Sequence, residues 1–394
     1  MREMDFSESN LFNRWCGVNT IWRQLEGEVK RQVKVSLERA LGEEVGRRVG
    51  CERYERSGSR RNYRNGHYER DLLSRYGWIE GLQVPRLRRG GYEHGIFERY
   101  RRRQRQLDWV LLEAFLLGHA TRKTRLSFKS TFGAEVSAQT VSNLVKELDG
   151  EVRRFHHRRL RDHYRFLYLD GLWLKVRRPC YQKKVLLVAL GVRADGEAEL
   201  LSFQVAVQES ESCWWGFVSD LQHRGLWGGS LEVIVSDGNP GLLKALQAHY
   251  PRVRRQRCTF HQATGLAKYC EQSRHRRRLV NDALAIFNAE HEKEARRRLR
   301  QFREKWSAKE PAAVRNLLKG FESCLTYLDF PEPWRTRLKT NNLIERYLEE
   351  LNRRIIPMRS FNNVASIERI VYGIIAYVLN QPQEVPEHQF TQNA

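Results

Sequence analysis

The sequence lacks a long hydrophobic run. The best apolar stretch near the C-terminus, Ile370 to Leu379, is well below the roughly 20 residues that a membrane-spanning helix needs. The N-terminus begins Met-Arg-Glu-Met-Asp and has no apolar stretch typical of a secretion signal. These absences argue against a membrane protein, and we expect a cytoplasmic location.

Cysteine is scarce, and repeats and low-complexity linkers are absent. The seven cysteines stand at positions 16, 51, 180, 213, 258, 270 and 324. An odd number scattered through 394 residues argues against a disulfide framework. We therefore expect reduced thiols, most of them buried. Hydrophobic residues make up 41% of the chain, enough for packed cores in two or three domains.

Acidic residues are heavily outnumbered. There are 70 Lys and Arg against 47 Asp and Glu, a formal net charge of +23, which is typical of a protein that binds a polyanion. From Cys51 to Gln106 the chain has 15 Arg, no Lys and 7 acids, interleaved with tyrosines. Arginine can contact phosphates and guanine edges, and aromatic rings can stack on bases. We predict DNA contacts by Arg60, Arg61 and Arg64, although a solvated basic face remains the alternative.

The first 150 residues favour helices. Residues 19–46 fit one or two amphipathic helices, and residues 75–86 fit a short strand. Three short helices are expected at 107–117, 121–132 and 138–148, the last capped by Ser137. This pattern suggests a helix-turn-helix, whose last helix would present Gln139, Thr140, Ser142 and Asn143 to a major groove. A generic three-helix core would give nearly the same pattern.

After a basic connector at 153–165 the pattern changes to strands. We predict strands at 166–176, 184–192 and 199–207, with a hairpin turn at 193–196, then a helix at 212–223. A strand at 231–235, a helix at 241–249 and a strand at 253–258 follow. Such an order describes a mixed α/β sheet. Residues 265–335 read as a helical insertion before a last helix at 341–354, with Trp306, Phe321 and Trp334 as expected anchors.

Two aspartates occupy positions where a carboxylate is unexpected without a functional role. Asp170 lies within the apolar strand 166–176, where a carboxylate is costly unless it is paired or binds a metal. Asp237 follows directly after a strand and precedes Gly-Asn-Pro-Gly241. Phosphoryl transfer requires hard cations that are held by carboxylates. Asp170 and Asp237 are candidates for such metal-binding carboxylates. For Asp237 alone, a turn or helix-capping role is an equal alternative.

Several fragments, in order, resemble the Mutator-type transposases of bacterial insertion sequences over roughly residues 50 to 380. They are Tyr63-Arg-Asn-Gly66, Arg75-Tyr-Gly77 with Val84-Pro-Arg86, Thr140 to Leu148, Leu169-Asp-Gly171, Glu209-Ser-Glu-Ser212 with Trp215, Ser236-Asp-Gly238, Cys258-Thr-Phe-His261, and Asn341 to Arg346 leading to Pro357-Met358 and Phe361. The gaps 237 − 170 = 67 and 345 − 237 = 108 fit the family's pattern of two aspartates, a helical insertion and a glutamate.

The resemblance implies a ribonuclease H-like core in which Asp170, Asp237 and Glu345 are catalytic and hold two Mg²⁺ ions, with Mn²⁺ able to substitute. It implies nicking of DNA at the terminal inverted repeats and attack of the freed 3′-hydroxyl on a second phosphodiester, without a nucleotide cofactor. The partner is then double-stranded DNA, the location is the nucleoid, and a homodimer or larger oligomer is expected because two element ends must meet.

The same reading predicts five segments. These are a helical and Arg-rich DNA-binding region at 1–106, the helix-turn-helix at 107–152, the first part of the catalytic core at 153–264, the helical insertion at 265–335, and the second part of the core at 336–394 with the acid-bearing helix and a C-terminal helix.

Three ambiguities surround the glutamate and the Cys/His pair. Glu349 lies one turn after Glu345, and Glu350 is adjacent to it. Seven residues after Glu345, where such enzymes often carry a basic residue, stands Asn352, and Arg353 and Arg354 are then the expected DNA contacts. Cys258 and His261, with Cys270 and His275, could bind zinc, but a thiol and an imidazole that support the site beside Asp237 are favoured.

The tract from Pro251 to Arg278 carries nine Lys and Arg and one acid, and Arg254 and Arg255 are predicted to bind DNA beside the catalytic edge. Two rival functions stay open at this level. One is a catalytically inactive, sequence-specific DNA-binding protein derived from a transposase. The other is a different ribonuclease H-like nuclease, such as a junction resolvase.

Overall fold

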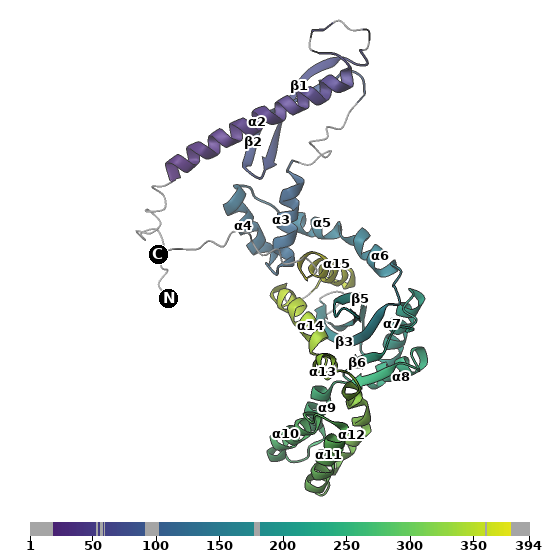
Figure 1. The fold of residues 1–394 in the computed structure, drawn as a ribbon. Coiled ribbons are helices and arrows are strands. Elements are labelled where there is room, and N and C mark those ends of the chain that lie inside the picture. Colours follow the sequence, from purple (N-terminus) through teal and green to yellow (C-terminus); the bar gives the residue numbers. More distant parts are fainter. Residues whose placement is uncertain are drawn as a thin grey trace, which may run out of the picture. The chain divides into compact units, whose positions relative to one another are not determined.

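The computed structural model describes residues 19–52, 54, 55, 58, 60–90, 102–176, 182–358 and 361–379. The chain divides into two compact units, residues 1–145 and 146–394, which are drawn together in Figure 1. The first unit holds a two-stranded sheet and the second a five-stranded sheet. Each unit is built around its own buried apolar residues.

The first unit begins with one long helix that packs on a β-hairpin. Helix α2 (Asn19–Val49) is a single helix, and strands β1 (Arg64–Ser74) and β2 (Gly77–Leu87) pair antiparallel. Leu41 of α2 is buried with Ile79, Leu82 and Val84 of β2. The strand predicted at 75–86 is confirmed as β2. Strand β1 escaped prediction because most of its length is exposed and polar, so it lacks an alternating pattern.

Three helices follow, as predicted: α3 (Arg105–Leu116), α4 (Thr121–Phe132) and α5 (Ala138–Lys146). Gly133, at φ +65°, ends α4 in the left-handed conformation. The Ser137 hydroxyl accepts the N–H of Thr140 at 3.0 Å and so caps α5. The basic connector predicted at 153–165 is wrong in its first part, because α6 (Asp149–His157) continues to His157 and buries Val152.

The second unit is organised around a mixed five-stranded sheet, which confirms the predicted α/β class. Its strands are β3 (Tyr164–Val176), β4 (Gln182–Arg193), β5 (Ala198–Ala206), β6 (Val233–Ser236) and β7 (Arg254–Arg257). The order in the sheet is β5-β4-β3-β6-β7. Strands β3, β4 and β5 are antiparallel neighbours, whereas β6 runs parallel to β3, and β7 parallel to β6.

Helices cover both faces of this sheet (Figure 1). Helices α7 (Glu211–His223) and α8 (Pro240–His249) pack on the face that carries Leu167 and Leu169 of β3. Side chains alternate along a strand, so Phe166, Tyr168 and Asp170 belong to the other face. Helix α14 (Asn342–Ile355) contacts β3, and the Tyr168 hydroxyl donates to the Arg337 carbonyl at 3.0 Å. Asp170 therefore lies on the face covered by α14.

Helix α15 (Val364–Ile374) and the π-helical turn η7 (Ile375–Leu379) close the described chain. The side chain of Asn363 caps α15. Arg369 forms an ion pair with Asp149 of α6, and the Tyr372 hydroxyl donates to Glu151 at 3.3 Å. Through these contacts α6 and α15, far apart in sequence, are held together.

The segment between β7 and α14 is helical, as predicted, and has its own core. Its elements are α9 (Thr259–Gly265), η2 (Leu266–Tyr269), η3 (Ser273–His275), α10 (Arg276–Phe287), α11 (Glu292–Trp306), α12 (Pro311–Gly320), η4 (Glu322–Cys324), η5 (Thr326–Asp329) and α13 (Glu332–Leu338). Trp306 and Phe321 are buried in this core. Trp334 instead packs against Phe166 of the sheet, with ring centroids 4.9 Å apart.

Five of the seven cysteines lie in the described ranges, and all five are free thiols. Cys51, Cys258, Cys270 and Cys324 are buried and Cys213 is partly buried, as expected, while Cys16 and Cys180 lie outside the described residues. Across the described ranges, the structure has no helix with both the length and the apolar character needed to cross a membrane.

Candidate active site

Asp170 and Asp237 are brought together by the pairing of β3 with β6. Tyr168 pairs with Val235 at the end of this parallel ladder, and Asp170 and Asp237 each stand two residues beyond that pair. Oδ1 of Asp237 accepts the N–H of Asn239 at 2.9 Å. The carbonyl oxygen of Asp237 accepts from Nε of Arg257, the last residue of β7, at 3.2 Å. Hydrogen bonds to its side chain and to its backbone carbonyl thus hold Asp237 in place after β6.

Gly238, between Asp237 and Asn239, cannot be replaced without strain. Its φ is +86°, and a Cβ at this position would lie 2.3 Å from Nε of Arg257. Both the left-handed backbone and the close approach of the guanidinium require glycine. The turn that presents Asp237 therefore depends on this residue and on Arg257, which was not predicted as a site residue.

The electrostatics of Asp170 show which carboxylates surround it. Burial raises the pKa of Asp170 to about 7, although the Gly171 N–H donates to its Oδ1 at 2.8 Å and favours the charged form. The negative charges of Asp237, Glu345 and Glu209 contribute to this rise to about 7. Three carboxylates, from the loop after β6, α14 and the segment before α7, therefore repel the charged form of Asp170. A divalent cation would relieve this repulsion.

Glu345 lies in the first turn of α14, and the start of that helix is tied to the end of β7. The backbone N–H and the hydroxyl of Thr259 both donate to the Lys339 carbonyl, at 3.1 and 3.0 Å. The N–H of buried Asn341 donates to Sγ of Cys258 at 3.4 Å, and the N–H of Glu345 donates to the Asn341 carbonyl at 2.9 Å. Cys258 and Thr259 thus contact the backbone that leads into α14.

The two neighbouring glutamates are placed differently. Glu349 is exposed and is not among the carboxylates that raise the pKa of Asp170. Glu350 forms ion pairs with Arg353 and Arg354, each at 2.7 Å. Of the three glutamates on this helix, only Glu345 acts on Asp170.

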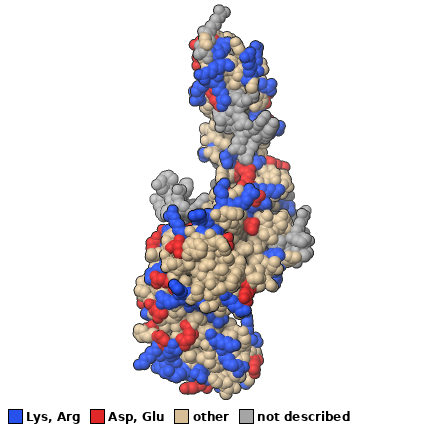
Figure 2. Space-filling view, turned by 90° about the vertical axis from the view of Figure 1, so that its right-hand side faces the viewer, with Lys and Arg blue, Asp and Glu red and all other residues tan. Residues whose placement is uncertain are grey.

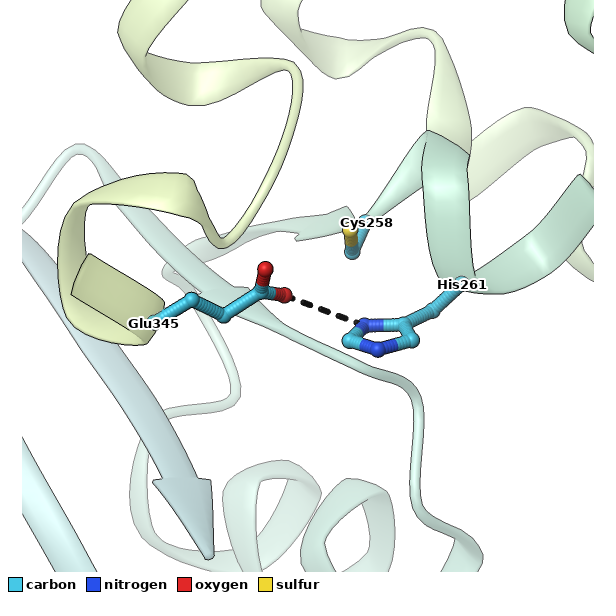
Figure 3. Close-up of side chains that lie close together, drawn as sticks. All are labelled: Cys258, His261 and Glu345. Atoms are coloured by element: carbon cyan, nitrogen blue, oxygen red, sulfur yellow. Dashed lines mark ion pairs between the residues drawn. The ribbon is translucent and has the colours of Figure 1, made fainter. Parts of the chain in front are cut away.

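Figure 3 shows Cys258, His261 and Glu345 pointing toward one another. Their potential ligand atoms lie within 4.8 Å of each other, and Nδ1 of His261 is 3.5 Å from Oε1 of Glu345. A hydrogen bond with Cys258 raises the pKa of His261, and the charges of Glu345 and Asp237 add to this effect against the opposing effect of burial. Oε1 of Glu345 is buried and has no hydrogen-bond partner among the described residues. A buried carboxylate oxygen that makes no hydrogen bond can serve as a ligand for a divalent cation.

The four residues considered for zinc do not converge. Nδ1 of His275 is 2.8 Å from Oε1 of Glu310, a fully buried carboxylate that also accepts the N–H groups of Glu271 and Gln272. Sγ of Cys270 donates to the Gln272 carbonyl at 3.2 Å. Burial alone would raise the pKa of Glu310, but the hydrogen bonds from His275 and the backbone hold it at about 2. Cys270 and His275 belong to this separate cluster, and Cys258 and His261 lie with Glu345.

The three arginines predicted to contact DNA from the first unit differ in their surroundings. Arg60 donates to Sγ of Cys51 at 3.1 Å and to the Glu55 carbonyl. Arg64 donates to the carbonyls of Cys51 and Glu52, at 3.0 and 3.3 Å, and so ties the end of α2 to the start of β1. The exposed side chain of Arg61 makes no hydrogen bond or ion pair that involves the described residues alone. Arg60 and Arg64 therefore have a structural role, whereas Arg61 faces solvent.

The polar residues predicted on α5 lie on its outer side. Gln139, Ser142 and Asn143 are exposed, and Nε2 of Gln139 donates to Oδ1 of Asn143 at 2.8 Å. The Thr140 hydroxyl lies 3.0 Å from Oγ of Ser137, within the cap of the helix. Val141, Leu144 and Val145 form the buried side.

Arg254 and Arg255 are not at the edge that carries Asp237. They start β7, where Arg254 pairs with Val233, whereas the other end of this strand reaches Ser236. Arg254 pairs with Asp329 at 3.3 Å and lies over the Phe330 ring, and Arg255 donates to Gln247. Arg353 is exposed on α14, and Arg354 is largely buried against Glu350. Within the basic tract predicted beside Asp237, β7 brings Arg257 and not Arg254 or Arg255 to that residue, and DNA contact by Arg254 and Arg255 stays a prediction.

Two further features were missed in the sequence. One is Glu209, which belongs to the fragment Glu209 to Ser212 that resembles the family but was not predicted as a site residue, and which directly precedes the helix cap Ser210. The other is an all-basic helix surface on α4, formed by Arg122, Lys123, Arg125 and Lys129 without an acid in the helix. Arg122, Arg125 and Lys129 line a cavity of about 180 Å³ with Leu126, Glu135 and Val136. In Figure 2, Lys and Arg gather over the part that holds β1, β2 and α2 and also over the helical segment between β7 and α14, whereas the face over α7 and α8 is mostly uncharged.

Comparison with known proteins shows the family of the chain. Residues 17–383 match the model of the family described as "Transposase, Mutator family". The transposase for insertion sequence element ISRM5 of Rhizobium meliloti is 31% identical over 347 residues, covering 88% of this chain and 86% of the relative. The transposase for IS256 in transposon Tn4001 of Staphylococcus aureus is 32% identical, over 83% of this chain and 84% of that protein. The transposase for IS1081 of Mycobacterium tuberculosis is also 32% identical, over 85% and 81%. The chain belongs to the Mutator family of transposases.

Proposed function

We propose that this chain is a DDE transposase with a ribonuclease H-like core that binds the terminal inverted repeats of an insertion sequence, nicks the element ends and joins the 3′-hydroxyl to another phosphodiester. The observation that carries the proposal is that the paired strands β3 and β6 bring Asp170 and Asp237 close together, and the pKa of Asp170, raised to about 7 by burial and by Asp237, Glu345 and Glu209, agrees with it. Carboxylates that repel one another at the edge of a sheet are costly, and bound cations would offset this cost.

In this proposal Asp170, Asp237 and Glu345 hold two Mg²⁺ ions, for which Mn²⁺ can substitute. Bound in such a pair, divalent cations activate the attacking oxygen and stabilise the leaving oxygen of a phosphodiester. Asp170 offers its carboxylate from a rigid strand, and Asp237 is oriented by the N–H of Asn239. Glu345 offers Oε1, which forms an ion pair with His261 but makes no hydrogen bond within the described residues, from the anchored start of α14. Carboxylate oxygens are the ligands that such ions prefer, while the described residues whose ligand atoms lie within 4.8 Å of one another are Cys258, His261 and Glu345.

DNA recognition is assigned to the first unit. The exposed side of α5, with Gln139, Ser142 and Asn143, has the polar groups that read base edges. The basic surface of α4 and the exposed Arg61 have the charge that binds phosphates. A dimer is expected, since two element ends have to be joined in one reaction.

The test is a cleavage assay on labelled element-end DNA with Mg²⁺. Asp170→Asn, Asp237→Asn and Glu345→Gln each abolish nicking, because each removes a ligand oxygen's charge, while DNA affinity stays within about twofold. Glu349→Gln, which changes an exposed glutamate on the same helix, cleaves like the unaltered protein. Cleavage by any of the first three variants contradicts the assigned roles. If the unaltered protein binds DNA but does not cleave it, the rival function holds, which is a catalytically inactive DNA-binding protein derived from a transposase.

A further inference from the structure

Glu209, the fourth carboxylate, lies directly against the backbone that carries Asp170. A Cβ added to Gly171 would lie 2.9 Å from Oε1 of Glu209 and 3.1 Å from its Cδ. The absence of a side chain at Gly171 therefore makes room for the carboxylate beside β3. Glu209 is half-buried, and the side chain of Trp173 also hydrogen-bonds to it.

A continuous set of hydrogen bonds connects Glu209 with Asp237. Oε2 of Glu209 accepts from Nδ2 of Asn239 at 3.1 Å. Oδ1 of the same Asn239 side chain accepts the N–H groups of Gly241 and Leu242, at 2.9 and 3.3 Å, and caps α8. The backbone N–H of Asn239 donates to Oδ1 of Asp237 at 2.9 Å. Asn239 is thus fixed by Glu209 on one side and orients Asp237 on the other.

Placing a carboxylate here costs free energy. Burial raises the pKa of Glu209, and the nearby charge of Asp237 raises it further. Within the described ranges, no Lys or Arg forms an ion pair with Glu209. A half-buried acid next to two others, held only by neutral donors, calls for a compensating benefit, and orientation of Asp237 is the benefit that its contacts provide.

We propose that Glu209 is a positioning residue, which holds Asp237 in its metal-binding orientation through the side chain of Asn239. This inference rests on the proposed function, since it requires that Asp237 binds a divalent cation. Carboxylate ligands of metals depend on hydrogen bonds from surrounding groups, and loss of such a group typically lowers metal affinity by about 10- to 100-fold.

The test measures Mn²⁺ affinity of the full chain by electron paramagnetic resonance, without DNA, together with thermal stability. Glu209→Ala removes the acceptor for Asn239. Asn239→Ser keeps a side chain that can cap α8 but cannot reach Glu209. Each variant is expected to bind Mn²⁺ about tenfold more weakly, and the double variant no more weakly than either single one, because both break the same connection.

Two further variants separate positioning from charge. Glu209→Gln keeps an oxygen that accepts from Asn239, so affinity returns to within about threefold of the unaltered protein. Glu211→Ala removes an equal charge two residues away, where Glu211 forms an exposed ion pair with Lys244 at 2.7 Å, and leaves affinity unchanged. If Glu209→Gln binds as weakly as Glu209→Ala while Asn239→Ser binds normally, charge alone matters and the positioning role is overturned. Normal binding by Glu209→Ala also overturns it.

Asp237→Asn in the same assay tells the two claims apart. If Asp237→Asn loses Mn²⁺ and the Glu209 variants do not, only the positioning role fails. If Asp237→Asn binds Mn²⁺ like the unaltered protein, the proposed metal site itself is wrong.

Discussion

At the scale of single residues, the site is a place where like charges are kept together. Asp170 lies among apolar strand residues, and the charges of three other carboxylates raise its pKa. Free energy spent in this way is characteristic of functional sites, where stability is sacrificed for a required arrangement. The cost can be measured without any knowledge of the DNA substrate.

Asp170→Asn should stabilise the metal-free protein at high pH. The pKa of Asp170 is raised in the folded state, so the unfolded chain releases its proton first and the free energy of unfolding falls as pH rises from about 4 to about 7. The asparagine variant escapes this loss and should be more stable by on the order of 1–3 kcal/mol at pH 8, but not at pH 4. Chemical denaturation with a chelator present measures this, and Glu349→Gln serves as the control. A variant that is equally or less stable at pH 8 contradicts the repulsion.

Arg64 and Arg61 should respond in opposite ways to substitution. Arg64→Ala leaves the carbonyls of Cys51 and Glu52 without their donor, and should lower stability by about 1–3 kcal/mol. Arg61→Ala should leave stability unchanged and weaken DNA binding, since Arg61 is exposed. Thermal unfolding and a DNA-binding titration on both variants make the comparison. Loss of stability in Arg61→Ala, or none in Arg64→Ala, would show that these assignments are reversed.

The sequence predicted some residues of the site and not others, for a physical reason. Asp170 was predicted because a charge inside an apolar strand is conspicuous. The importance of Glu209 and Arg257 comes from neighbours distant in the chain, Gly171 and Asp237, and no local pattern records such contacts. The hydrogen bonds of Arg64 to backbone carbonyls were likewise not predictable from composition, and its contact with DNA stays a prediction.

At the scale of elements, strands with buried faces were predictable and exposed ones were not. Strands β3, β4 and β5 carry continuous apolar residues, so their positions were confirmed within a few residues. Strand β1 and helix α6 consist largely of exposed polar residues, and neither was predicted from the sequence. Which end of β7 meets Asp237 depends on its parallel pairing with β6, which the sequence does not encode locally.

The basic surface of α4 should contribute measurably to DNA affinity. Replacing Arg122, Lys123 and Lys129 with Gln should weaken binding and reduce the slope of log affinity against log salt by about 2–3, since each lost phosphate contact removes roughly 0.9. Arg125 is kept because its Nε donates to the Val136 carbonyl at 2.7 Å. A binding titration at several salt concentrations measures the slope.

A matched control tests whether the effect is local. Arg297, Arg300 and Arg303 are exposed on α11, and changing them to Gln removes the same charge from the second unit. This control should change the slope by less than about one. Equal effects of the two triple variants would indicate that only the net charge of the chain matters.

At the scale of the whole molecule, the proposed site combines three positions that are distant in the sequence. Asp170, Asp237 and Glu345 are separated by 67 and 108 residues, and a helical segment with its own core lies between the last two. The parallel pairing of β3 with β6 and the anchoring of α14 to β7 bring them together. The net charge of +23 suits a protein whose partner is DNA.

The most direct test of this account is anomalous X-ray diffraction from crystals of the full chain soaked in Mn²⁺. The account predicts two anomalous peaks bounded by the carboxylates of Asp170, Asp237 and Glu345, with Mn–O distances of roughly 2.0–2.3 Å, the range for hard cations bound by oxygen. Peaks only at Cys258 and His261, or a Mn²⁺-loaded protein without metal between the two aspartates, would contradict it.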